Sequence, residues 1–401
     1  MANIESLIDE LLTRGVDRIY PSREALEVAL LGRGRLTIYL GVDPTGSHLH
    51  LGHATNLLTL KRFHQLDHKI IFLIGDFTGM IGDPSGKSQT RKQLTEKEIR
   101  ENLKTFKAQV ARVLDFKGKN PVKVMFNSKW WKNMKVAELA SIASNFTVQQ
   151  MIQRDMFQER MKADKPISVQ EFFYPLFQGY DSVAMDVDME IGGTDQTFNM
   201  LIGRDLMRIY KDKNKFVVTT KLLVNPKTGN KLMNKSEGGL INLDDEPNDM
   251  FGKVMALDDA IMLDVAELCT TIPQDELEGL KTLVSLKPRD AKALVANWVV
   301  RTYHGGKAAD EAQAEFDKIF KDKELPNEIP ALKITKKEIA IIDLLVETKL
   351  ASSKGEARRL IEQGGVKIDG ERVLDVRRII SIFPKGVLLQ VGKRHFMRVT
   401  S

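Results

Sequence analysis

Residues 36–53, LTIYLGVDPTGSHLHLGH, join an apolar run to three histidines through a short break. The run at 36–42 contains β-branched side chains and is typical of a strand buried in a parallel sheet. After the histidines, apolar residues recur at helical spacing, and a second apolar run follows at 70–75. Strand, helix and strand in about forty residues predict a βαβ unit. Its right-handed crossover predicts a doubly wound α/β sheet.

The rest of the chain extends this sheet and adds helices. Further strands are predicted at 122–126, 183–191 and 216–224. Residues 128–170 are rich in Met and Gln and predict helices inserted between strands; such helices are more often core than an oligomer interface. From 245 to 325 the apolar spacing is helical throughout.

Composition narrows the class of protein. With 401 residues, 42% hydrophobic and 28% charged, the chain can bury sizeable cores in two or three domains. It contains no apolar run of the roughly 18 residues that span a bilayer, and its first 15 residues predict an acidic amphipathic helix rather than a signal peptide. The single cysteine, Cys269, excludes an internal disulfide and a zinc–thiolate cluster. We therefore expect a cytoplasmic protein that does not enter membranes.

Positive charge is concentrated at the C-terminal end. Residues 331–401 carry 15 Lys and Arg against 8 Asp and Glu, a net +7, whereas the whole chain carries +6. A basic module on a neutral body favours a polyanionic partner such as nucleic acid, although a solvated charged face is the commoner meaning of such a run.

The basic module has a predicted local structure. Ser353 and Glu356 form a capping-box pattern, Gly364 and Gly365 end the helix, and Asp369-Gly370 predicts a hairpin turn. Helical spacing then places three basic side chains along one stripe: Lys354, Arg358 and Arg359.

The paired histidines suggest a phosphate site. His50 and His53 lie three residues apart across a helix start, beside unpaired N–H groups and the positive end of the helix dipole. Gly52 costs roughly 1 kcal/mol relative to alanine in a helix, a cost that makes sense if a flat ligand such as a purine lies against bare backbone. An isolated HxxH is usually a surface pair, but this one follows the first strand of a βαβ unit, where open α/β sheets bind ligands.

Two glycine-containing segments differ in how well they fit a role at a phosphate site. GDPSGKSQT, residues 82–90, contains the GKS that ends a P-loop. A P-loop also requires a glycine five residues before the glycine of GKS, but that position holds Ile81. In addition, Asp83 suits a cationic group better than a phosphate. KTGNKLMNKSEGG, residues 227–239, carries Lys231 and Lys235 between glycines. A mobile lysine there could neutralise charge on a transferring phosphoryl group, whereas a basic surface loop is the plainer interpretation.

Together the HxGH and late MxKS patterns resemble the HIGH and KMSKS signatures of class I aminoacyl-tRNA synthetases. Five blocks in order, YLGVDPTGSHLHLGH, GMIGDPSGK, FFYPLFQGYD, EIGGTDQTFN and KLMNKSEGG, resemble those of the bacterial tyrosyl-tRNA synthetases, in the form of their second subgroup. Residues 335–401 resemble the S-four-like RNA-binding domain of that family. The resemblance covers essentially the whole chain.

The resemblance implies a fold and a domain organisation. It implies a Rossmann-like catalytic domain at 1–235 with a helical dimerisation insertion at about 128–170. An α-helical anticodon-region domain with the exit of the mobile loop follows at 236–330, and a small α+β S-four-like domain at 335–401. It also implies a homodimer.

The same resemblance implies an activity, tyrosine–tRNA ligation, and a role for each matched residue. ATP and tyrosine would give tyrosyl-adenylate and pyrophosphate, after which tyrosine passes to the 3′ end of tRNA(Tyr). The implied catalytic residues are Thr45, His50, His53, Lys231 and Lys235. The implied ATP contacts are Asp43, Gly52, His53, Gly193, Asp195, Lys235 and Ser236. The implied tyrosine contacts are Tyr39, Asp83, Tyr174, Gln178, Asp181 and Gln196. The implied tRNA contacts are Lys354, Arg358, Arg359 and Lys367. Mg²⁺ would accompany ATP without a dedicated protein site.

Two departures from the family pattern leave alternatives open. Leu232 stands where KMSKS has its first lysine, so Lys231 is the candidate replacement; EIGGTDQTFN makes contacts near Glu190 and Thr197 less certain. A different HxGH nucleotidyl-transferring enzyme, such as a tryptophan-activating synthetase, and a non-catalytic RNA-binding paralogue remain as alternatives.

Overall fold

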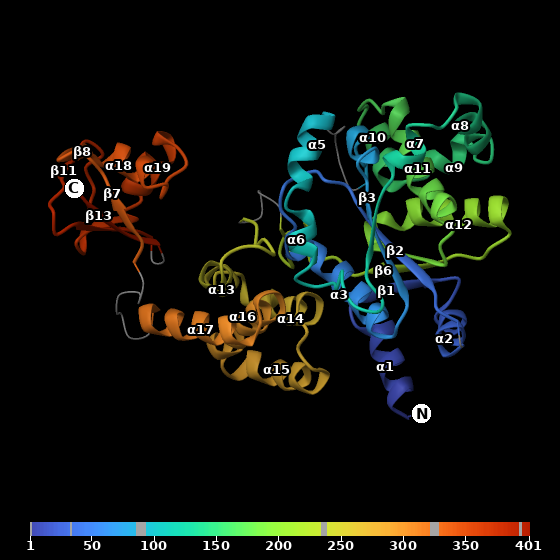
Figure 1. The fold of residues 1–401 in the computed structure, drawn as a ribbon, viewed down its shortest axis with the longest axis horizontal. Helices are drawn as coiled ribbons and strands as arrows, with labels where there is room; N and C mark the ends of the chain where they lie inside the picture. Colours follow the sequence, from blue (N-terminus) through green and yellow to red (C-terminus); the bar gives the residue numbers. More distant parts are fainter. Residues whose placement is uncertain (1, 33, 86–93, 234–238, 321–328, 393–394) are drawn as a thin grey trace. The chain divides into compact units, whose positions relative to one another are not determined.

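The structure is a computed structural model that describes residues 2–32, 34–85, 94–233, 239–320, 329–392 and 395–401. Contacts divide the chain into two compact units (Figure 1). The first unit comprises Met1–Asp245 and Leu257–Gly306, and the second comprises Glu246–Ala256 and Lys307–Ser401. These boundaries differ from the expected functional domains at 1–235, 236–330 and 335–401, which stay a prediction. No helix among the described residues is long and apolar enough to cross a membrane.

A six-stranded sheet forms the centre of the first unit, in the order β1-β6-β5-β2-β3-β4. Its strands are β1 (Val16–Tyr20), β2 (Thr37–Val42), β3 (Lys69–Ile74), β4 (Lys123–Phe126), β5 (Met189–Gly193) and β6 (Phe216–Thr220). All neighbouring pairs are parallel except β1 with β6. The doubly wound parallel sheet predicted from the first βαβ unit is confirmed.

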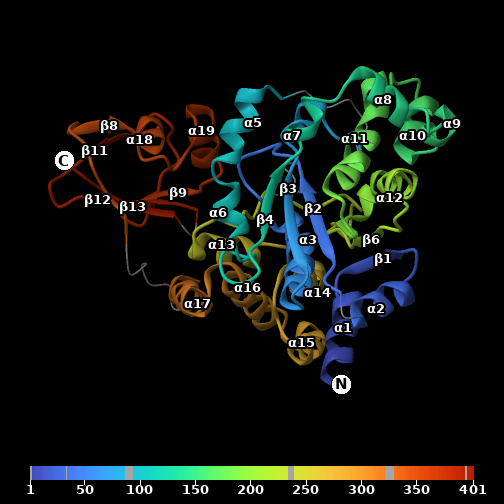
Figure 2. The same cartoon turned by 45° about the vertical axis from the view of Figure 1, so that its right-hand side comes forward.

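The strand order reverses at β2, which pairs with β3 on one side and with β5 on the other. Right-handed crossovers that run in opposite directions place their helices on opposite faces of the sheet. Accordingly, α3 (Leu51–Gln65) and α12 (Thr197–Lys211) lie on either side of it (Figure 2). In open α/β sheets, ligands bind beyond the carboxyl ends of the strands at such a reversal.

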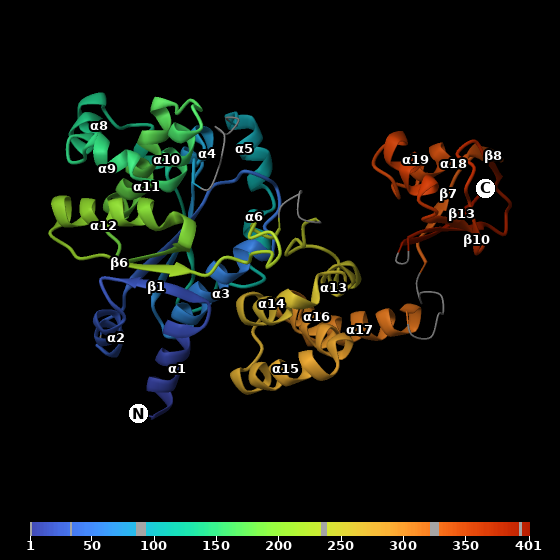
Figure 3. The same cartoon turned by 180° about the vertical axis from the view of Figure 1, so that it is seen from behind.

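Helices complete the first unit (Figure 3). Besides α3 and α12 they are α1 (Ala2–Thr13), α2 (Arg23–Leu31), α4 (Thr78–Ile81), α5 (Glu96–Leu103), α6 (Phe106–Val110), α7 (Ser128–Trp131), α8 (Val136–Ala143), α9 (Val148–Ile152), α10 (Asp155–Lys162), α11 (Val169–Met185), η1 (Thr194–Gln196), η3 (Asp259–Ile261), α14 (Met262–Cys269), α15 (Gln274–Leu286) and α16 (Pro288–His304). Helix α7 through the start of α11 occupies the segment predicted as inserted helices.

The strand predicted at 183–191 is wrong in its first half. Residues to Met185 belong to α11, Asp186 ends that helix in the left-handed conformation (φ 51°), and β5 begins only at Met189. The strand predicted at 216–224 stops at Thr220. Strand β1 was not predicted, because VDRIY is short and half polar.

Helix α14 joins the helices that follow it to the sheet of the first unit, because it packs on α15 and α16 as well as on a helix of the sheet. It packs on α3. The guanidinium of Arg14, in the first unit's N-terminal segment, donates to the carbonyl oxygens of Glu267, Thr270 and Ile272 at 3.2, 3.0 and 2.6 Å. These bonds satisfy carbonyls at the end of α14 that have no helical partner.

The second unit combines two helices with a small α+β domain. Its elements are α13 (Pro247–Met255), α17 (Gly306–Phe320), β7 (Ala331–Lys333), β8 (Glu338–Ala340), α18 (Ile341–Glu347), α19 (Lys354–Glu362), β9 (Val366–Ile368), β10 (Glu371–Arg372), β11 (Ile379–Ser381), β12 (Val387–Val391) and β13 (His395–Thr400). The sheets have the orders β10-β9-β12-β13-β7 and β11-β8. Because β7 pairs with β13, this domain begins before residue 335.

Local predictions in this domain are largely confirmed. The Ser353 hydroxyl oxygen accepts from the Glu356 N–H at 3.2 Å, but the Glu356 carboxylate accepts from the N–H of Ser352 instead of closing the predicted box. Gly364 has φ 68° just after α19, and Asp369 and Gly370 have φ 48° and 90° between β9 and β10, as a type I′ hairpin requires.

Candidate active site

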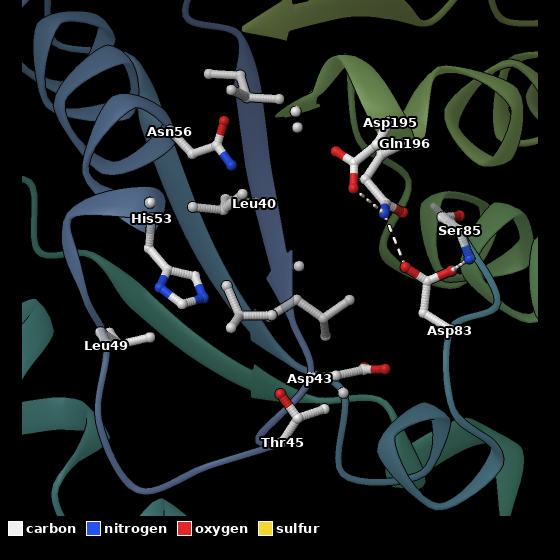
Figure 4. Close-up of a pocket in the computed structure, with 18 of the residues that line it drawn as sticks. Leu40, Asp43, Thr45, Leu49, His53, Asn56, Asp83, Ser85, Asp195 and Gln196 are labelled. Atoms are coloured by element: carbon white, nitrogen blue, oxygen red, sulfur yellow. Dashed lines mark hydrogen bonds between the residues drawn. The ribbon is translucent and has the colours of Figure 1, made fainter. Parts of the chain in front are cut away.

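A pocket of about 740 Å³ lies in the first unit, beyond the carboxyl ends of β2 and β5. It is lined by fourteen of the residues expected to contact tyrosine or ATP: Tyr39, Asp43, Thr45, His50, Gly52, His53, Asp83, Tyr174, Gln178, Asp181, Gly193, Asp195, Gln196 and Lys231. Figure 4 shows His53 on one side of this pocket and Asp83, Asp195 and Gln196 on the other. Lys235 and Ser236 lie outside the described residues. Among the described residues, no group of three His, Cys, Asp or Glu side chains is placed to hold a metal ion.

The two histidines cap the helix that carries them. His50 is the N-cap of α3, and its Nδ1 accepts from the N–H of Gly52 at 3.2 Å. Nδ1 of His53 accepts from the N–H of His50, also at 3.2 Å, and the rings lie 4.1 Å apart. The expectation that these N–H groups are unpaired at the helix start is therefore wrong, because the imidazoles themselves satisfy them.

This capping sets the chemistry of both rings. Burial lowers the pKa of His50 to about 3 and that of His53 to about 4, so both are neutral at pH 7. A neutral imidazole that accepts at Nδ1 carries its hydrogen on Nε2. Each ring thus supplies one uncharged N–H donor, a group that suits the oxygen of an anionic ligand.

The structure explains the glycine at position 52 by its contact with the His50 ring, without a purine ligand. A Cβ at this position would lie 2.9 Å from Cε1 and 3.0 Å from Nδ1 of the His50 ring that caps the helix. It would also lie 3.6 Å from Cβ of Met233. Any side chain here would displace the cap.

Amide groups organise the part of the pocket expected to hold the substrate ammonium. Asp83 accepts from the N–H of Ser85 at 2.9 Å and from Nε2 of Gln196 at 2.8 Å. Nδ2 of Asn199 donates to the amide oxygens of both Gln196 and Gln178, at 3.1 and 2.9 Å. The carboxylate and amide oxygens are held in place before any ligand arrives, which suits a cation.

Tyr174 connects this region to the end of β2. Its hydroxyl donates to Oδ2 of Asp43 at 2.8 Å, while Oδ1 of Asp43 accepts from Thr78 at 2.7 Å.

Asp181 lies at the deep end of the pocket. Its carboxylate accepts from the indole N–H groups of Trp130 and Trp131, both at 2.8 Å, and from the Asn127 amide at 3.2 Å. Burial nevertheless raises the pKa of Asp181 to about 8. Tyr39 is fully buried beside it, and its hydroxyl lies 2.9 Å from Oγ of Ser182. A phenol and a carboxyl group thus stand together, as the tyrosine-site expectation requires.

Up to Met233, the lysine-containing segment forms a hairpin rather than an open loop. Val224 bridges Lys231 in antiparallel fashion, and the N–H of Leu232 donates to Leu223 at 2.8 Å. Lys231 Nζ lies 2.6 Å from Asp195, the expected ribose contact. Leu232 and Met233 are buried.

Several residues of the site were not predicted as contacts: Asn127, Trp130, Trp131, Ser182, Glu190, Asn199 and Lys215. Ser182 adjoins a recognised block, and Glu190 and Asn199 lie within one, so proximity in sequence was an available signal for these three. Lys215 gives no such signal, because it is one of several lysines in a polar stretch before β6.

The expected tRNA contacts lie in the second unit. Lys354, Arg358 and Arg359 are exposed on α19, and Lys367 is half-buried in β9. Lys354 pairs with Asp343 at 2.7 Å, which neutralises part of the predicted stripe.

Comparisons with known proteins agree with this geometry. The model of the class I tRNA synthetases (W and Y) matches residues 32–321, and that of the tyrosine–tRNA ligase SYY-like C-terminal domain matches residues 321–399. The tyrosine–tRNA ligase of Moorella thermoacetica is 44% identical over 97% of this chain and 94% of its own length, and that of Haemophilus ducreyi is 43% identical over 99% of each.

Solved structures share the fold. A truncated mitochondrial tyrosyl-tRNA synthetase of Aspergillus nidulans covers 78% of this chain and 94% of its own, with a TM-score of 0.66 and 22% identity. The tyrosyl-tRNA synthetase of Archaeoglobus fulgidus, solved with L-tyrosine, covers 77% and 99%, with a TM-score of 0.59 and 20% identity. With both family models and the full-length relatives in agreement, the chain belongs to the class I tRNA synthetases and, within them, to the tyrosine–tRNA ligases.

Proposed function

We propose that this pocket activates tyrosine with ATP and that the chain then transfers the tyrosyl group to the 3′ end of tRNA(Tyr). The tyrosine carboxylate attacks the α-phosphate, pyrophosphate leaves, and the adenylate is the donor to tRNA. No side-chain nucleophile takes part. Catalysis therefore consists of positioning and of stabilising charge in the transition state.

The observation that carries the proposal is the distribution of polar groups along one pocket. The deep end holds Tyr39 and Asp181, which suit a phenol. The middle holds Asp83 among oriented amides, which suits an ammonium. The region of His50 offers neutral N–H donors, which suit phosphates. This order, phenol, ammonium, phosphate, is that of tyrosyl-adenylate.

Each ATP role follows from position. Thr45, His50 and His53 donate to phosphate oxygens, and Asp195 with Gly193 takes the ribose. Lys231 supplies positive charge once it leaves Asp195, and Lys235 is expected to join it. Mg²⁺ arrives with ATP as part of the substrate.

A phenylalanine ligand would offer no acceptor to the Tyr39 hydroxyl and no donor to the Asp181 carboxylate on the side that faces the pocket. Buried polar groups that lose their partner carry a large free-energy cost. Rejection of the analogue that lacks the hydroxyl is a principle for which tyrosyl-tRNA synthetase itself is the standard example.

Two further proposals concern partners. The basic surface of α19 and β9 would bind tRNA in the cytoplasm, where this reaction is expected to take place. The inserted helices would form a homodimer, since they expose Val136, Val148 and Val169 at 85%, 67% and 72%. Light scattering should then give twice the mass of the chain, and Val148→Glu should shift it toward the monomer; a monomeric wild-type protein would contradict the dimer.

Amino-acid-dependent ATP–pyrophosphate exchange tests the activity. Exchange with tyrosine, and with none of the other nineteen amino acids at equal concentration, is the expected result. Exchange with tryptophan alone would indicate the alternative synthetase, and exchange with none would indicate a non-catalytic paralogue. Transfer to tRNA(Tyr) with labelled tyrosine tests the second step.

A further inference from the structure

A buried ammonium lies directly behind the expected phenol-binding groups. Lys215 is completely buried, and its Nζ donates to Oγ of Ser182 at 2.9 Å and to Oε2 of Glu190, which is only 2% exposed. The Ser182 oxygen in turn lies 2.9 Å from the Tyr39 hydroxyl. Nζ also lies 5.8 Å from the centre of the Tyr39 ring.

The fold makes room for this ammonium. Helices α11 and α12 cross at two glycines, where a Cβ on Gly179 would lie 3.0 Å from the backbone nitrogen of Gly203. A Cβ on Gly203 would lie 2.6 Å from Nζ of Lys215 and 3.1 Å from Oγ of Ser182. Only a glycine pair leaves the space that the lysine head occupies.

Glu190 carries the connection to the other end of the tyrosine site. Its Oε2 accepts from Lys215, and its Oε1 accepts from the amide of Gln178 at 3.0 Å. The parallel register pairs Tyr39 with Glu190 on neighbouring strands, so this carboxylate also lies beside the Tyr39 ring. Burial, the charges of Glu190 and Asp181, and hydrogen bonding with the Glu190 carboxylate hold the pKa of Tyr39 well above its usual range, so its hydroxyl keeps its hydrogen.

We propose that Lys215 is a positioning residue for phenol recognition: by donating to Ser182 and Glu190 it weakens their competition for the Tyr39 hydrogen, so that Tyr39 donates to the substrate oxygen. The proposal rests on the proposed function, because it assumes that tyrosine places its phenol between Tyr39 and Asp181.

The direction of the hydrogen bonds carries the argument. An ammonium only donates, so Lys215 occupies one of the two lone pairs of the Ser182 oxygen and leaves the Ser182 O–H to be donated; we infer that this O–H points toward the Tyr39 oxygen. Each carboxylate oxygen of Glu190 likewise accepts from a donor other than Tyr39, so the Gln178 amide and the Lys215 ammonium compete with the Tyr39 hydrogen for this carboxylate. Tyr39 then donates to the phenol oxygen, while the ionised Asp181 accepts the phenol hydrogen. The substrate hydroxyl has one partner of each kind.

Without the ammonium the chain of bonds can reverse. Ser182 would accept the hydrogen of Tyr39, so tyrosine would lose a donor, and phenylalanine would no longer leave that hydroxyl without a partner. Replacement of Lys215 alone would strand the buried charge of Glu190. The informative change is therefore the neutral pair Lys215→Met with Glu190→Gln.

The test measures kcat/KM for tyrosine and for phenylalanine in ATP–pyrophosphate exchange. The neutral pair is expected to lower the tyrosine-to-phenylalanine ratio by roughly 3- to 10-fold, the effect of about one hydrogen bond. Lys213→Met is the matched control: Lys213 lies two residues away, pairs with Asp188 at 2.7 Å near the surface, and should leave the ratio unchanged. Thermal unfolding of each variant confirms that it is folded.

Ser182→Ala distinguishes the proposed role of Lys215 from a purely structural one, because only the proposed role predicts that this variant changes the tyrosine-to-phenylalanine ratio of kcat/KM. In the neutral-pair background it removes the competing acceptor and should raise the ratio back toward wild type. In the wild-type background, Ser182→Ala should give a ratio that is equal to or lower than that of the wild-type protein. A rise of threefold or more in the wild-type background would overturn the proposal, because Ser182 would then have been taking the Tyr39 hydrogen. This single variant decides the matter if the neutral pair does not fold.

Failure of the proposal is distinguishable from failure of the proposed site. If Tyr39→Phe lowers the ratio and the neutral pair does not, the phenol site stands and the role of Lys215 is refuted. If Tyr39→Phe leaves the ratio unchanged, the phenol does not bind at Tyr39 and the site assignment itself is wrong.

Discussion

Proton release on tyrosine binding is the sharpest consequence of the deep end of the pocket. Burial raises the pKa of Asp181 to about 8, so at pH 7 about nine-tenths of the empty sites hold a proton there. A phenol donates its O–H much more strongly to an ionised carboxylate than to a protonated one. Tyrosine should therefore bind the ionised form and expel the proton.

The sign and size of the effect follow by linkage. Because the free site binds a proton that the complex does not, affinity rises with pH until the pKa is passed and then levels off. With a pKa of about 8, the association constant should increase about ninefold from pH 6 to pH 7 and about fivefold from pH 7 to pH 8. Most of the rise lies below the pKa.

Isothermal titration calorimetry with tyrosine, in two buffers of different ionisation enthalpy, measures both quantities. At pH 7 we expect release of about 0.9 proton per tyrosine bound. Asp181→Asn is the matched control, because its amide cannot ionise and the groups common to both proteins still titrate. A wild-type profile parallel to that of Asp181→Asn, with equal proton release, would show that Asp181 binds the phenol without ionising and would refute the reasoning.

Three further outcomes are expected. Gly52→Ala should raise the KM for ATP without raising the melting temperature. Alanine gains roughly 1 kcal/mol of helix propensity, but its Cβ displaces the His50 cap, which is worth about 1 kcal/mol. A more stable, fully active variant would contradict this. Lys231→Met should lower kcat of exchange by roughly 10- to 100-fold while calorimetry shows unchanged tyrosine affinity. Lys227→Met, in the same hairpin but paired with Asp258, is the control and should leave kcat unchanged. Equal losses of kcat in the two variants would refute the role of Lys231. Deletion of 331–401 should weaken tRNA binding and flatten its salt dependence in filter-binding assays while exchange persists; a lost exchange would show that this segment supports the pocket.

The fold could be predicted where the burial of a strand produces a recognisable apolar pattern in the sequence. Strands β2 and β3 are buried on both faces, so their residues are apolar almost without interruption. β5 was misplaced because residues 183–191 alternate apolar and polar side chains, a strand pattern, although α11 runs through Met185. Only the left-handed Asp186 marks the helix end, and its conformation is set by the tertiary packing.

The site could be predicted where chemistry depends on neighbours in sequence. The histidine motif is such a case, since each contact between His50, Gly52 and His53 spans three residues or fewer. Lys215 is the opposite case. Its burial depends on the crossing of α11 and α12 at Gly179 and Gly203, which lie apart from it in the chain. One lysine in a polar stretch gives no sign of that crossing.

The neutral histidines have a consequence for the rest of the site. Because both imidazoles use Nδ1 to cap α3, neither takes up a proton at neutral pH, and they offer hydrogen bonds without charge. Pyrophosphate nevertheless leaves with increased negative charge, which N–H groups alone stabilise less than a cation does. On the proposed function, we expect that cation to come from the Mg²⁺ that accompanies ATP and from the lysines of the 227–239 segment. In the structure the first of these, Lys231, is paired with Asp195, the expected ribose contact. Binding of the ribose hydroxyls to Asp195 would therefore release Lys231, so that the positive charge becomes available only when the nucleotide is in place.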